Sequence, residues 1–461
     1  MLDEAGSMTV PGKEKAVAYP TKAFFVRMIT RDISLEDCIL DLIDNSVDGA
    51  WSQEGSRPMG LADGADLSSY RIEIEAGPEA FVIRDNCGGM TLDAAADHAF
   101  SFGRSSLSEH DEYSIGVYGI GMKRAVFKLG SEIRVRSTFT SEDGNRMSFA
   151  VPINVIDWLG SDAPPWDFDI VDDDPLDADG VEIVVRSLTQ GSSTSFSSPA
   201  FLQNLKRTIA RDYSFHLLRG LRIFLNGEPV TGWAIELRQS DEFVPVRMEY
   251  EDEVEGQPVS IEIIGGMAAP PPESIDPDES EEGDRRYGWY VVCNGRIVLA
   301  ADKSQITGWG TEGWPQWHYQ YAGFIGIIFF TAAKASALPL TTTKRSVDTS
   351  SEVYRRARPR MREVSKSWIS YTNQRKQALE EARRKENAAV AVPLAAVASR
   401  SAVTLPTLVP KPVEKPANIN YSVPVTRMKK MAKALGSINM PYREVGLKTF
   451  DYAYDDLVGD D

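Results

Sequence analysis

The chain has 461 residues, of which 42% are hydrophobic and 25% charged, a composition typical of a folded globular protein with two or three domains. Its formal net charge of −17 argues against an electrostatic grip on nucleic acid by the whole molecule, although a local basic patch stays compatible with it. The three cysteines form no C-x-x-C pair, so neither a disulfide framework nor a zinc site is indicated.

No targeting or membrane segment is expected. The first residues lack a basic segment followed by an apolar core, which a signal peptide would need. No apolar run reaches the roughly 18 residues that span a bilayer, and the run FIGIIFF at 324–330 predicts a buried strand instead. We therefore expect a cytoplasmic protein in a reducing compartment, with no membrane partner.

Residues 35–51, LEDCILDLIDNSVDGAW, have helical periodicity, and Ser34 is the expected N-cap. The apolar face consists of Leu35, Cys38, Ile39, Leu42, Ile43 and Val47. Asp41, Asn45 and Asp48 follow at i, i+4 and i+7, which puts them on one stripe of the helix. This stripe is either a solvated polar face or a site for Mg²⁺, which prefers oxygen ligands and takes several of them from phosphate and water.

The next elements are two strands, 70–76 and 80–85, joined by the turn GPE. The second strand runs into DNCGGM, in which Asp85 precedes a pair of glycines. One interpretation is a plain turn. The other is the floor of a pocket, where Asp85 accepts a hydrogen bond from an exocyclic amine, Gly89 leaves the backbone bare for a flat ring, and Met90 packs on that ring.

A third motif, IGVYGIGMKRAVFKLG, occupies 115–130. Gly116, Gly119 and Gly121 precede a helical run, and free N–H groups at a helix start favour a phosphate, to which Lys123 would add positive charge. The spacing matches neither the dinucleotide motif nor the P-loop. The alternative is a flexible turn ahead of a core helix.

Further strands are predicted within 132–138, 147–156 and 180–188, then a helix at 199–217, and then strands near 221–226, 257–265, 288–300 and 323–331. Residues 268–286 carry seven carboxylates and four prolines and predict a surface loop. Residues 352–386 are helical in composition and have eleven Lys/Arg against five Asp/Glu.

Taken together, the helix with Asp41 and Asn45, the strand ending in Asp85 and the glycine motif resemble the Bergerat-fold or GHKL ATPases, in particular MORC-like and MutL-like bacterial members. The resemblance covers roughly residues 22–190. It extends more weakly to about 350, where GWYVVCNGRIV resembles a strand pair of the transducer domain that follows the ATPase in such proteins.

The resemblance implies ATP and Mg²⁺ as cofactors and assigns roles to residues. Asn45 would bind magnesium, Asp85 would recognise the adenine amino group, and Asp41 would take the catalytic place of a glutamate as general base or water-orienting group. Lys344, in LPLTTTKRSVD, would reach the γ-phosphate, unless it is a solvent-exposed loop lysine. The other nucleotide-binding residues would be Asp48, Gly89, Met90, Ser105, Ser106, Gly116, Val117, Tyr118, Gly119, Ile120, Gly121, Met122 and Lys123, with 102–114 as the ATP lid.

Three residues depart from the family pattern. Cys87 stands where a glycine is usual, and Val181 stands where many relatives have a threonine near the base. Asp41 is one methylene shorter than glutamate, so the distance from its carboxylate to an attacking water would be greater by about 1.5 Å, the length of one C–C bond. Either slow hydrolysis or a differently held water is therefore expected.

The predicted fold class is α+β, a Bergerat-fold α/β sandwich followed by a smaller S5-like transducer domain and a helical and linker C-terminal tail. The expected boundaries are 1–195 for the ATPase, 196–350 for the transducer with its acidic loop 268–286, 351–387 for a basic helix, 388–418 for a linker and 419–461 for a C-terminal segment.

The predicted function is slow, Mg²⁺-dependent ATP hydrolysis that drives a conformational or dimerisation cycle, in DNA transactions or anti-phage defence by resemblance alone. The expected partners are a second copy in the ATP state and a protein effector or nucleic acid at 352–386. An ATP-locked interaction module that does not hydrolyse is the alternative. Histidine-kinase phosphotransfer is less favoured, because residues 1–21 contain no histidine to accept phosphate.

Overall fold

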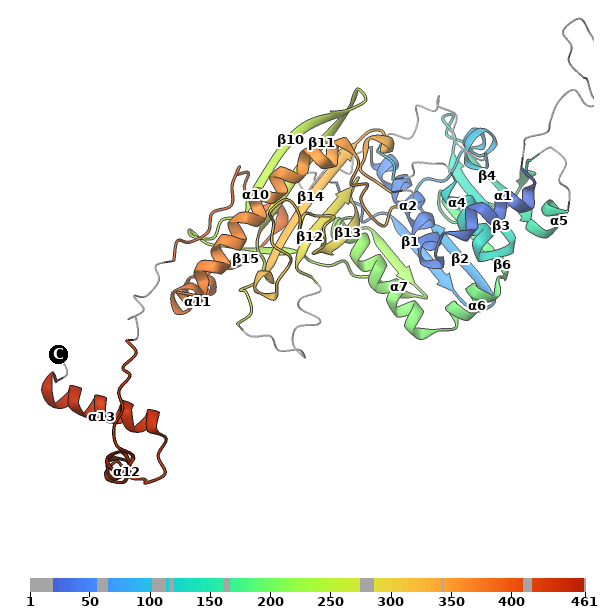
Figure 1. Ribbon diagram of the computed structural model, residues 1–461. Helices are drawn as coiled ribbons and strands as arrows, with labels where there is room; N and C mark the ends of the chain where they lie inside the picture. Colours follow the sequence, from blue (N-terminus) through green and yellow to red (C-terminus); the bar gives the residue numbers. More distant parts are fainter. Residues whose placement is uncertain are drawn as a thin grey trace, which may run out of the picture. The chain divides into compact units, whose positions relative to one another are not determined.

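The computed structural model describes residues 20–55, 65–101, 113–115, 120–160, 166–273, 286–341, 343–408 and 417–459. The chain divides into two compact units, Met1–Val409 and Pro410–Asp461. Both helices and strands contribute to the first unit, as the predicted α+β class requires (Figure 1).

An eight-stranded sheet organises the first half of this unit. In chain order its strands are β1 (Arg71–Ala76), β2 (Ala80–Asp85), β3 (Gly130–Thr140), β4 (Arg146–Asn154), β5 (Val171–Asp172), β6 (Gly180–Leu188), β7 (Arg222–Leu225) and β8 (Glu228–Pro229). They are arranged in the order β5-β4-β3-β6-β2-β1-β7-β8. β1 and β7 are parallel, and the other neighbouring pairs are antiparallel.

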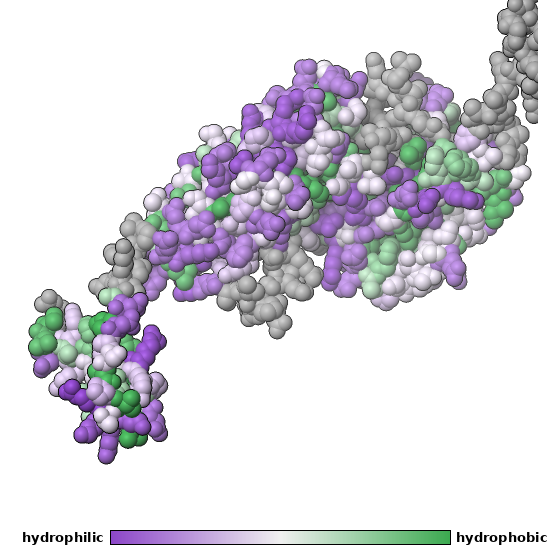
Figure 2. All heavy atoms as spheres, in the orientation of Figure 1, coloured by the Kyte–Doolittle hydropathy of each residue, from purple (hydrophilic) through white to green (hydrophobic). Residues whose placement is uncertain are grey.

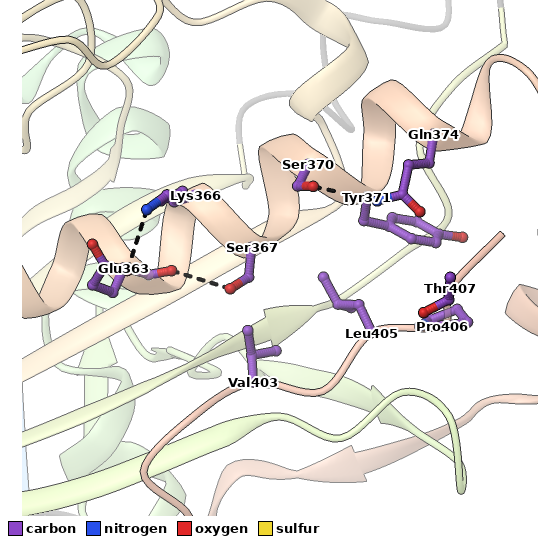
Figure 3. A pocket seen from close by; sticks show the side chains of 10 residues that line it. All are labelled: Glu363, Lys366, Ser367, Ser370, Tyr371, Gln374, Val403, Leu405, Pro406 and Thr407. Atoms are coloured by element: carbon purple, nitrogen blue, oxygen red, sulfur yellow. Dashed lines mark hydrogen bonds and ion pairs between the residues drawn. The ribbon is translucent and has the colours of Figure 1, made fainter.

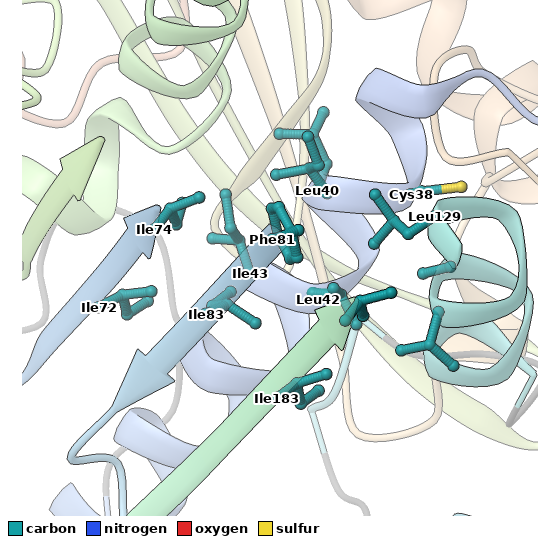
Figure 4. Close-up of a cluster of buried hydrophobic side chains, with 14 of the residues drawn as sticks. Cys38, Leu40, Leu42, Ile43, Ile72, Ile74, Phe81, Ile83, Leu129 and Ile183 are labelled. Carbon is teal, nitrogen blue, oxygen red and sulfur yellow. The ribbon is translucent and has the colours of Figure 1, made fainter. Parts of the chain in front are cut away.

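Helices α1 (Lys22–Arg31), α2 (Leu35–Glu54) and α4 (Gly121–Leu129) lie together on one face of this sheet (Figure 1). The apolar face of α2 packs on β1, β2 and β6, and Figure 4 shows Leu42 and Ile43 of α2 in the same cluster as Phe81 and Ile183. Burial of this predicted apolar face fixes which side of α2 turns away from the sheet. The remaining helices of this half are α3 (Leu92–Ala94), the π-helical turn η1 (Ala95–Ala99), α5 (Val155–Leu159), α6 (Gln190–Phe196), α7 (Pro199–Asp212) and α8 (Ser214–Leu218).

The first sheet continues past the expected boundary at 195. Arg222 to Leu225 of β7 pair in register with Arg71 to Ile74 of β1, so residues up to Pro229 complete the first sheet. The expected single helix at 199–217 is divided into α7 and α8 at Tyr213. Pairing between strands about 150 residues apart leaves no local signal in the sequence, which is why the boundary differs.

A second sheet has five strands in the order β10-β11-β14-β12-β13. They are β10 (Val246–Val254), β11 (Gln257–Met267), β12 (Gly288–Cys293), β13 (Arg296–Asp302) and β14 (Phe324–Ala332). β14 is buried along its whole length, as the run FIGIIFF predicts. The long helix α10 (Glu352–Arg375) lies across β10, β11 and β14 (Figure 1). Short turns η2 (Tyr319–Tyr321) and η3 (Ala335–Ala337) flank β14.

The basic stretch 352–386 forms two helices, α10 and α11 (Leu379–Ala388), and much of its charge is paired within the protein. Arg356 pairs with Asp252, Arg375 with Glu386, and Lys385 with Glu242 and Glu381. Asp252 and Glu242 lie outside 352–386, so their pairing offsets part of the positive excess of this stretch, whereas Glu381 and Glu386 are already counted in its composition.

The expected linker 388–418 needs correction over its first half. β15 (Val390–Pro393) pairs antiparallel with β9 (Glu236–Gln239), and the turn η4 (Leu394–Ala396) follows. Residues 400 and 404 then form bridges to 247 and 244. The first half of the predicted linker is therefore an extended segment paired with β9 and β10. Its Ala/Val/Pro composition has no helical period, and β pairing needs none. Of the acidic loop 268–286, residues 274–285 lie outside the described residues.

The second unit contains α12 (Val425–Ala434) and α13 (Tyr442–Leu457). In these two helices Ala432 and Val445 are buried, whereas large apolar side chains such as Phe450 and Tyr452 are exposed, and Figure 2 shows apolar groups on the surface of this unit. Within the described parts of the chain, no helix combines the length and apolarity needed to cross a bilayer.

Candidate functional site

Helix α2 begins at the predicted cap, where the Ser34 hydroxyl accepts a hydrogen bond of 3.0 Å from the Asp37 N–H. It ends at Gly55, whose φ of 65° suits a left-handed C-cap. The face turned away from the sheet core carries Asp41 and Asp44. These two residues are 3% and 0% exposed. Asp41, the first member of the predicted polar stripe, therefore belongs to a buried charged cluster and not to a solvated face.

Asp41 is held by two cations from distant segments. Its Oδ2 accepts a hydrogen bond of 2.7 Å from Nε of Arg124 on α4, and its Oδ1 lies 3.2 Å from Nζ of Lys344. Gly121, the first residue of α4, is so near that a Cβ there would lie 3.5 Å from Cγ of Asp41. The predicted base, the predicted sensor lysine and the start of the predicted phosphate helix therefore lie side by side.

Asp44, which the sequence reasoning missed, is the centre of a second group. It accepts hydrogen bonds from Lys344 Nζ at 2.8 Å, from the Tyr213 hydroxyl at 2.7 Å and from Arg296 of β13. Burial opposes the charge of Asp44, but Arg296 and Lys344 outweigh it, and the pKa of Asp44 is lowered. The spacing of Asp41 and Asp44 at i, i+3 on one face was the available signal.

Lys344 lies in the turn between Leu340 and Val347, which form an isolated antiparallel β-bridge. Its backbone has a φ of 55°, and its N–H donates to the Thr341 carbonyl at 2.9 Å. Burial disfavours the ammonium, yet Asp44 and Asp41 outweigh this effect, so the pKa of Lys344 is raised and the side chain is charged. The alternative of a solvent-exposed loop lysine is wrong, since this residue is 6% exposed.

Asn45 and Asp48 lie further along α2. Asn45 is exposed, while both carboxylate oxygens of Asp48 accept the N–H of Ile115 at 3.1 Å. Asp48 thus holds Ile115, the first residue of the glycine motif. Within the described ranges, no three His, Cys, Asp or Glu side chains gather to hold a metal ion. Asn45 fits a magnesium ion that takes its other oxygens from phosphates and water.

Asp85 ends β2, as predicted, and makes three hydrogen bonds. Its Oδ2 accepts the Ser46 hydroxyl at 2.6 Å, and its Oδ1 accepts the N–H groups of Cys87 at 2.9 Å and Val181 at 3.2 Å. Burial raises the pKa of Asp85, and these three bonds oppose that effect. A carboxylate has about four acceptor positions, so one more donor can be accepted.

The glycines after Asp85 serve packing within the protein. A Cβ on Gly89, whose φ is 73°, would lie 2.0 Å from the Thr138 carbonyl oxygen, and one on Gly88 would collide with the side chain of Gln53. Met90 exchanges two hydrogen bonds with the Ser137 hydroxyl. The interpretation that the backbone is bare for a nucleotide base therefore needs correction, since strand β3 and helix α2 occupy these positions.

Apart from Ile115, the glycine motif is described only from Ile120 onward. Ile120 is the N-cap of α4, followed by Gly121, Met122 and Lys123. The Lys123 ammonium donates to the carbonyls of Ala99 and Ser101 at 2.7 and 2.6 Å, so it anchors the segment ahead of the predicted lid. Ser105, Ser106, Gly116, Val117, Tyr118 and Gly119 lie outside the described residues.

The segment just before the glycine motif is also attached to the second sheet. The Tyr113 N–H donates to the Ala333 carbonyl at 2.6 Å, and Nδ2 of Asn294 donates to the Ser114 carbonyl at 3.2 Å. Residues 113–115 therefore connect α2, through Asp48, with the ends of β12 and β14.

A groove of about 340 Å³ lies elsewhere, between α10 and residues 403–407 (Figure 3). Its lining includes Lys366, Tyr371, Gln374 and Leu405, and it shares no residue with the cluster around Asp41. We assign no ligand to it.

Comparison with known proteins gives a match to one family, over a region that includes α2, β2 and α4. Among curated proteins no match was found. Residues 33–173 match the family described as histidine kinase-, DNA gyrase B-, and HSP90-like ATPases. For this part of the chain, which includes Asp41, Asn45, Asp85 and Gly121, the match supports the Bergerat-fold GHKL ATPase family.

Proposed function

We propose that the protein binds ATP with Mg²⁺ and hydrolyses it slowly, as a GHKL ATPase whose second sheet acts as a transducer. The observation that carries the proposal is the meeting of three segments at one point. Lys344 Nζ lies 3.2 Å from Asp41 Oδ1, and Gly121 at the start of α4 lies beside the same carboxylate. A base, a cation and free helix N–H groups are the parts that phosphoryl transfer needs.

Asp85 is the proposed receptor of the adenine amino group. Three of its roughly four acceptor positions are engaged by Ser46, Cys87 and Val181, which fix its orientation and leave one position for an amine. Val181 contributes through its backbone N–H, so the missing threonine at that position does not remove this support.

Asn45 is the proposed protein ligand of Mg²⁺, and the ion would neutralise charge on the phosphates. Asp41 would orient or deprotonate the attacking water. Lys344 would bond the γ-phosphate, and Asp48 would set the position of the loop that begins at Ile115.

Lys344 belongs to the second half of the chain and contacts Asp41 in the first half, and this contact supports a conformational cycle. ATP has a γ-phosphate that can bond Lys344, and ADP has none. ATP alone would therefore shift the arrangement of the two sheets. We propose that this state is a homodimer, which presents α10 and α11 to a protein effector or nucleic acid. Roles in DNA transactions or anti-phage defence are the biological settings that we propose for this cycle.

One observation favours the alternative of an ATP-locked module that does not turn over. Each carboxylate oxygen of Asp41 faces a cation, Arg124 on one side and Lys344 on the other. A base in this state is not available to a water molecule, so hydrolysis requires a rearrangement.

Calorimetry of Mg²⁺-ATP binding to the wild type and to Asp85→Asn tests the nucleotide site. The amide oxygen can still accept from Cys87 and Val181, and the Ser46 hydroxyl can accept from the new NH₂, so the fold is expected to survive. Loss of the adenine contact should lower affinity roughly ten- to a hundredfold, since an unpaired buried group costs about 1–3 kcal/mol.

The control is Asp252→Asn, a carboxylate of β10 that pairs with Arg356 in the second sheet. It should leave nucleotide affinity unchanged. Equal affinities of the wild type and Asp85→Asn would refute the adenine assignment.

A further inference from the structure

The two carboxylates of α2 belong to one continuous row of alternating charge. In order, its members are Arg124, Asp41, Lys344, Asp44 and Arg296, which we call the charge row. They come from α4, α2, the turn after β14, α2 again and β13. All five are at most 9% exposed.

The charge row has an excess of positive charge. Three cations face two carboxylates, and the nearby Tyr213 contributes a neutral hydroxyl. The buried carboxylate of Asp212 also attracts Arg296, but it lies closer to other cations, at 2.6 Å from Arg211 and 3.7 Å from Arg345. Burying an excess cation is costly, so the charge row, as far as the described residues define it, is suited to a further anion.

The two ends of the charge row differ in how they are held. Arg296 is 1% exposed, and its partner Asp44 has additional donors in Tyr213 and Lys344. Arg124 lies in the first turn of α4, three residues after Gly121, and the free N–H groups at this helix start already favour an anion. An arriving anion therefore meets Arg124 and Lys344, which share Asp41 as their partner.

We propose that Arg124 is a second γ-phosphate-sensing residue, and that Arg124 and Lys344 keep Asp41 ion-paired until the terminal phosphate of ATP takes both cations. This inference rests on the proposed ATPase function. A planar guanidinium can bond two phosphate oxygens at once, whereas Nε and Nη2 of Arg124 now both contact the single oxygen Oδ2 of Asp41. ADP lacks the terminal phosphate, so with ADP the Asp41 carboxylate stays occupied.

In the nucleotide-free protein, Asp41 would compete with the γ-phosphate for Arg124 and Lys344. Removing its charge while keeping its shape releases Arg124 and Lys344 for phosphate. Asp41→Asn is therefore expected to bind an ATP analogue more tightly than the wild type, while its ADP affinity is unchanged. A base that merely lies near the phosphate would give no such gain.

The test compares affinities for a non-hydrolysable ATP analogue and for ADP, both with Mg²⁺, by calorimetry. Arg124→Met should weaken analogue binding by about ten- to a hundredfold, the worth of one charge-assisted bond, and leave ADP affinity unchanged. Arg124→Lys retains the charge and should recover part of the loss. Thermal unfolding of each variant checks that the protein is folded.

The matched control is Arg375→Met. Arg375 forms an equally buried pair with Glu386, through Nε at 2.7 Å and Nη2 at 3.0 Å, in α10 and α11. Its loss should leave the ratio of analogue to ADP affinity unchanged.

Two results would overturn the inference and leave the ATPase proposal standing. One is an equal loss, or no loss, of both affinities in Arg124→Met. The other is an Asp41→Asn variant whose analogue affinity does not rise. A wild-type protein that binds neither nucleotide would overturn the proposed function, and this inference with it.

Discussion

The buried pair of Asp44 and Arg296 provides the sharpest prediction about stability. Arg296 belongs to the second sheet and Asp44 to the helix on the first sheet, so this pair joins the two halves of the first unit without any ligand. Asp44→Asn keeps the shape of the side chain but leaves the guanidinium of Arg296 without its anion. Arg296→Met leaves Asp44 with two remaining donors, Lys344 and Tyr213.

The two single variants are expected to differ for this reason. Removing the anion leaves an uncompensated buried cation, which costs about 3–5 kcal/mol. Removing Arg296 costs one hydrogen bond to a charged group, about 1.5–3 kcal/mol. The double variant Asp44→Asn/Arg296→Met has no orphaned guanidinium, so its loss should be smaller than the sum of the single losses by about 2 kcal/mol.

Urea unfolding followed by tryptophan fluorescence measures these free energies of unfolding. The exposed pair of Arg146 and Asp179 serves as the control, and its coupling should not exceed about 1 kcal/mol. If the losses of Asp44→Asn and Arg296→Met add to within about 0.5 kcal/mol, the pair does not join the two sheets energetically.

Three further predictions concern other parts of the first unit. Burial lowers the pKa of His216 from 6.5 to about 3, so the unfolded chain gains a proton first as the pH falls. Stability should drop by about 2 kcal/mol between pH 8 and pH 5, and His216→Asn should flatten this dependence in pH-dependent melts. Gly89→Ala places a Cβ 2.0 Å from the Thr138 oxygen and should lower the free energy of unfolding by about 2–4 kcal/mol. Gly144 also has a positive φ, of 79°, but open space around it, so Gly144→Ala should lower this free energy by only about 1 kcal/mol. Lys344→Ala should abolish the compaction or dimerisation seen by light scattering with an ATP analogue and spare ADP affinity; a response like that of the wild type would contradict its sensor role.

Local features of the site followed from the sequence. The cap at Ser34, the burial of the apolar face of α2, the end of β2 at Asp85 and the helix after Gly121 each depend on a few neighbouring residues. Such features are encoded in periodicity and in turn chemistry. The resemblance then linked these segments, and the structure brings Asp41, Gly121 and Lys344 together.

The missed features depend on contacts between residues far apart in the chain. The two charged partners of Asp44 come from β13 and from the turn between Leu340 and Val347, and no pattern near Asp44 identifies Arg296. Position 89 requires glycine because a Cβ there would collide with the carbonyl of Thr138 on β3. In both cases the chemistry of a residue is decided by tertiary packing, which a single sequence does not display.

Phosphate release from Mg²⁺-ATP by the wild type and by Asp41→Ala tests the central claim most directly. Asp41 lies between Arg124 and Lys344 at the start of α4, and we propose that it acts on the attacking water. The account predicts slow turnover by the wild type, and an Asp41→Ala variant that binds Mg²⁺-ATP at least as tightly but releases no phosphate. Phosphate release at the same rate in both proteins would contradict it.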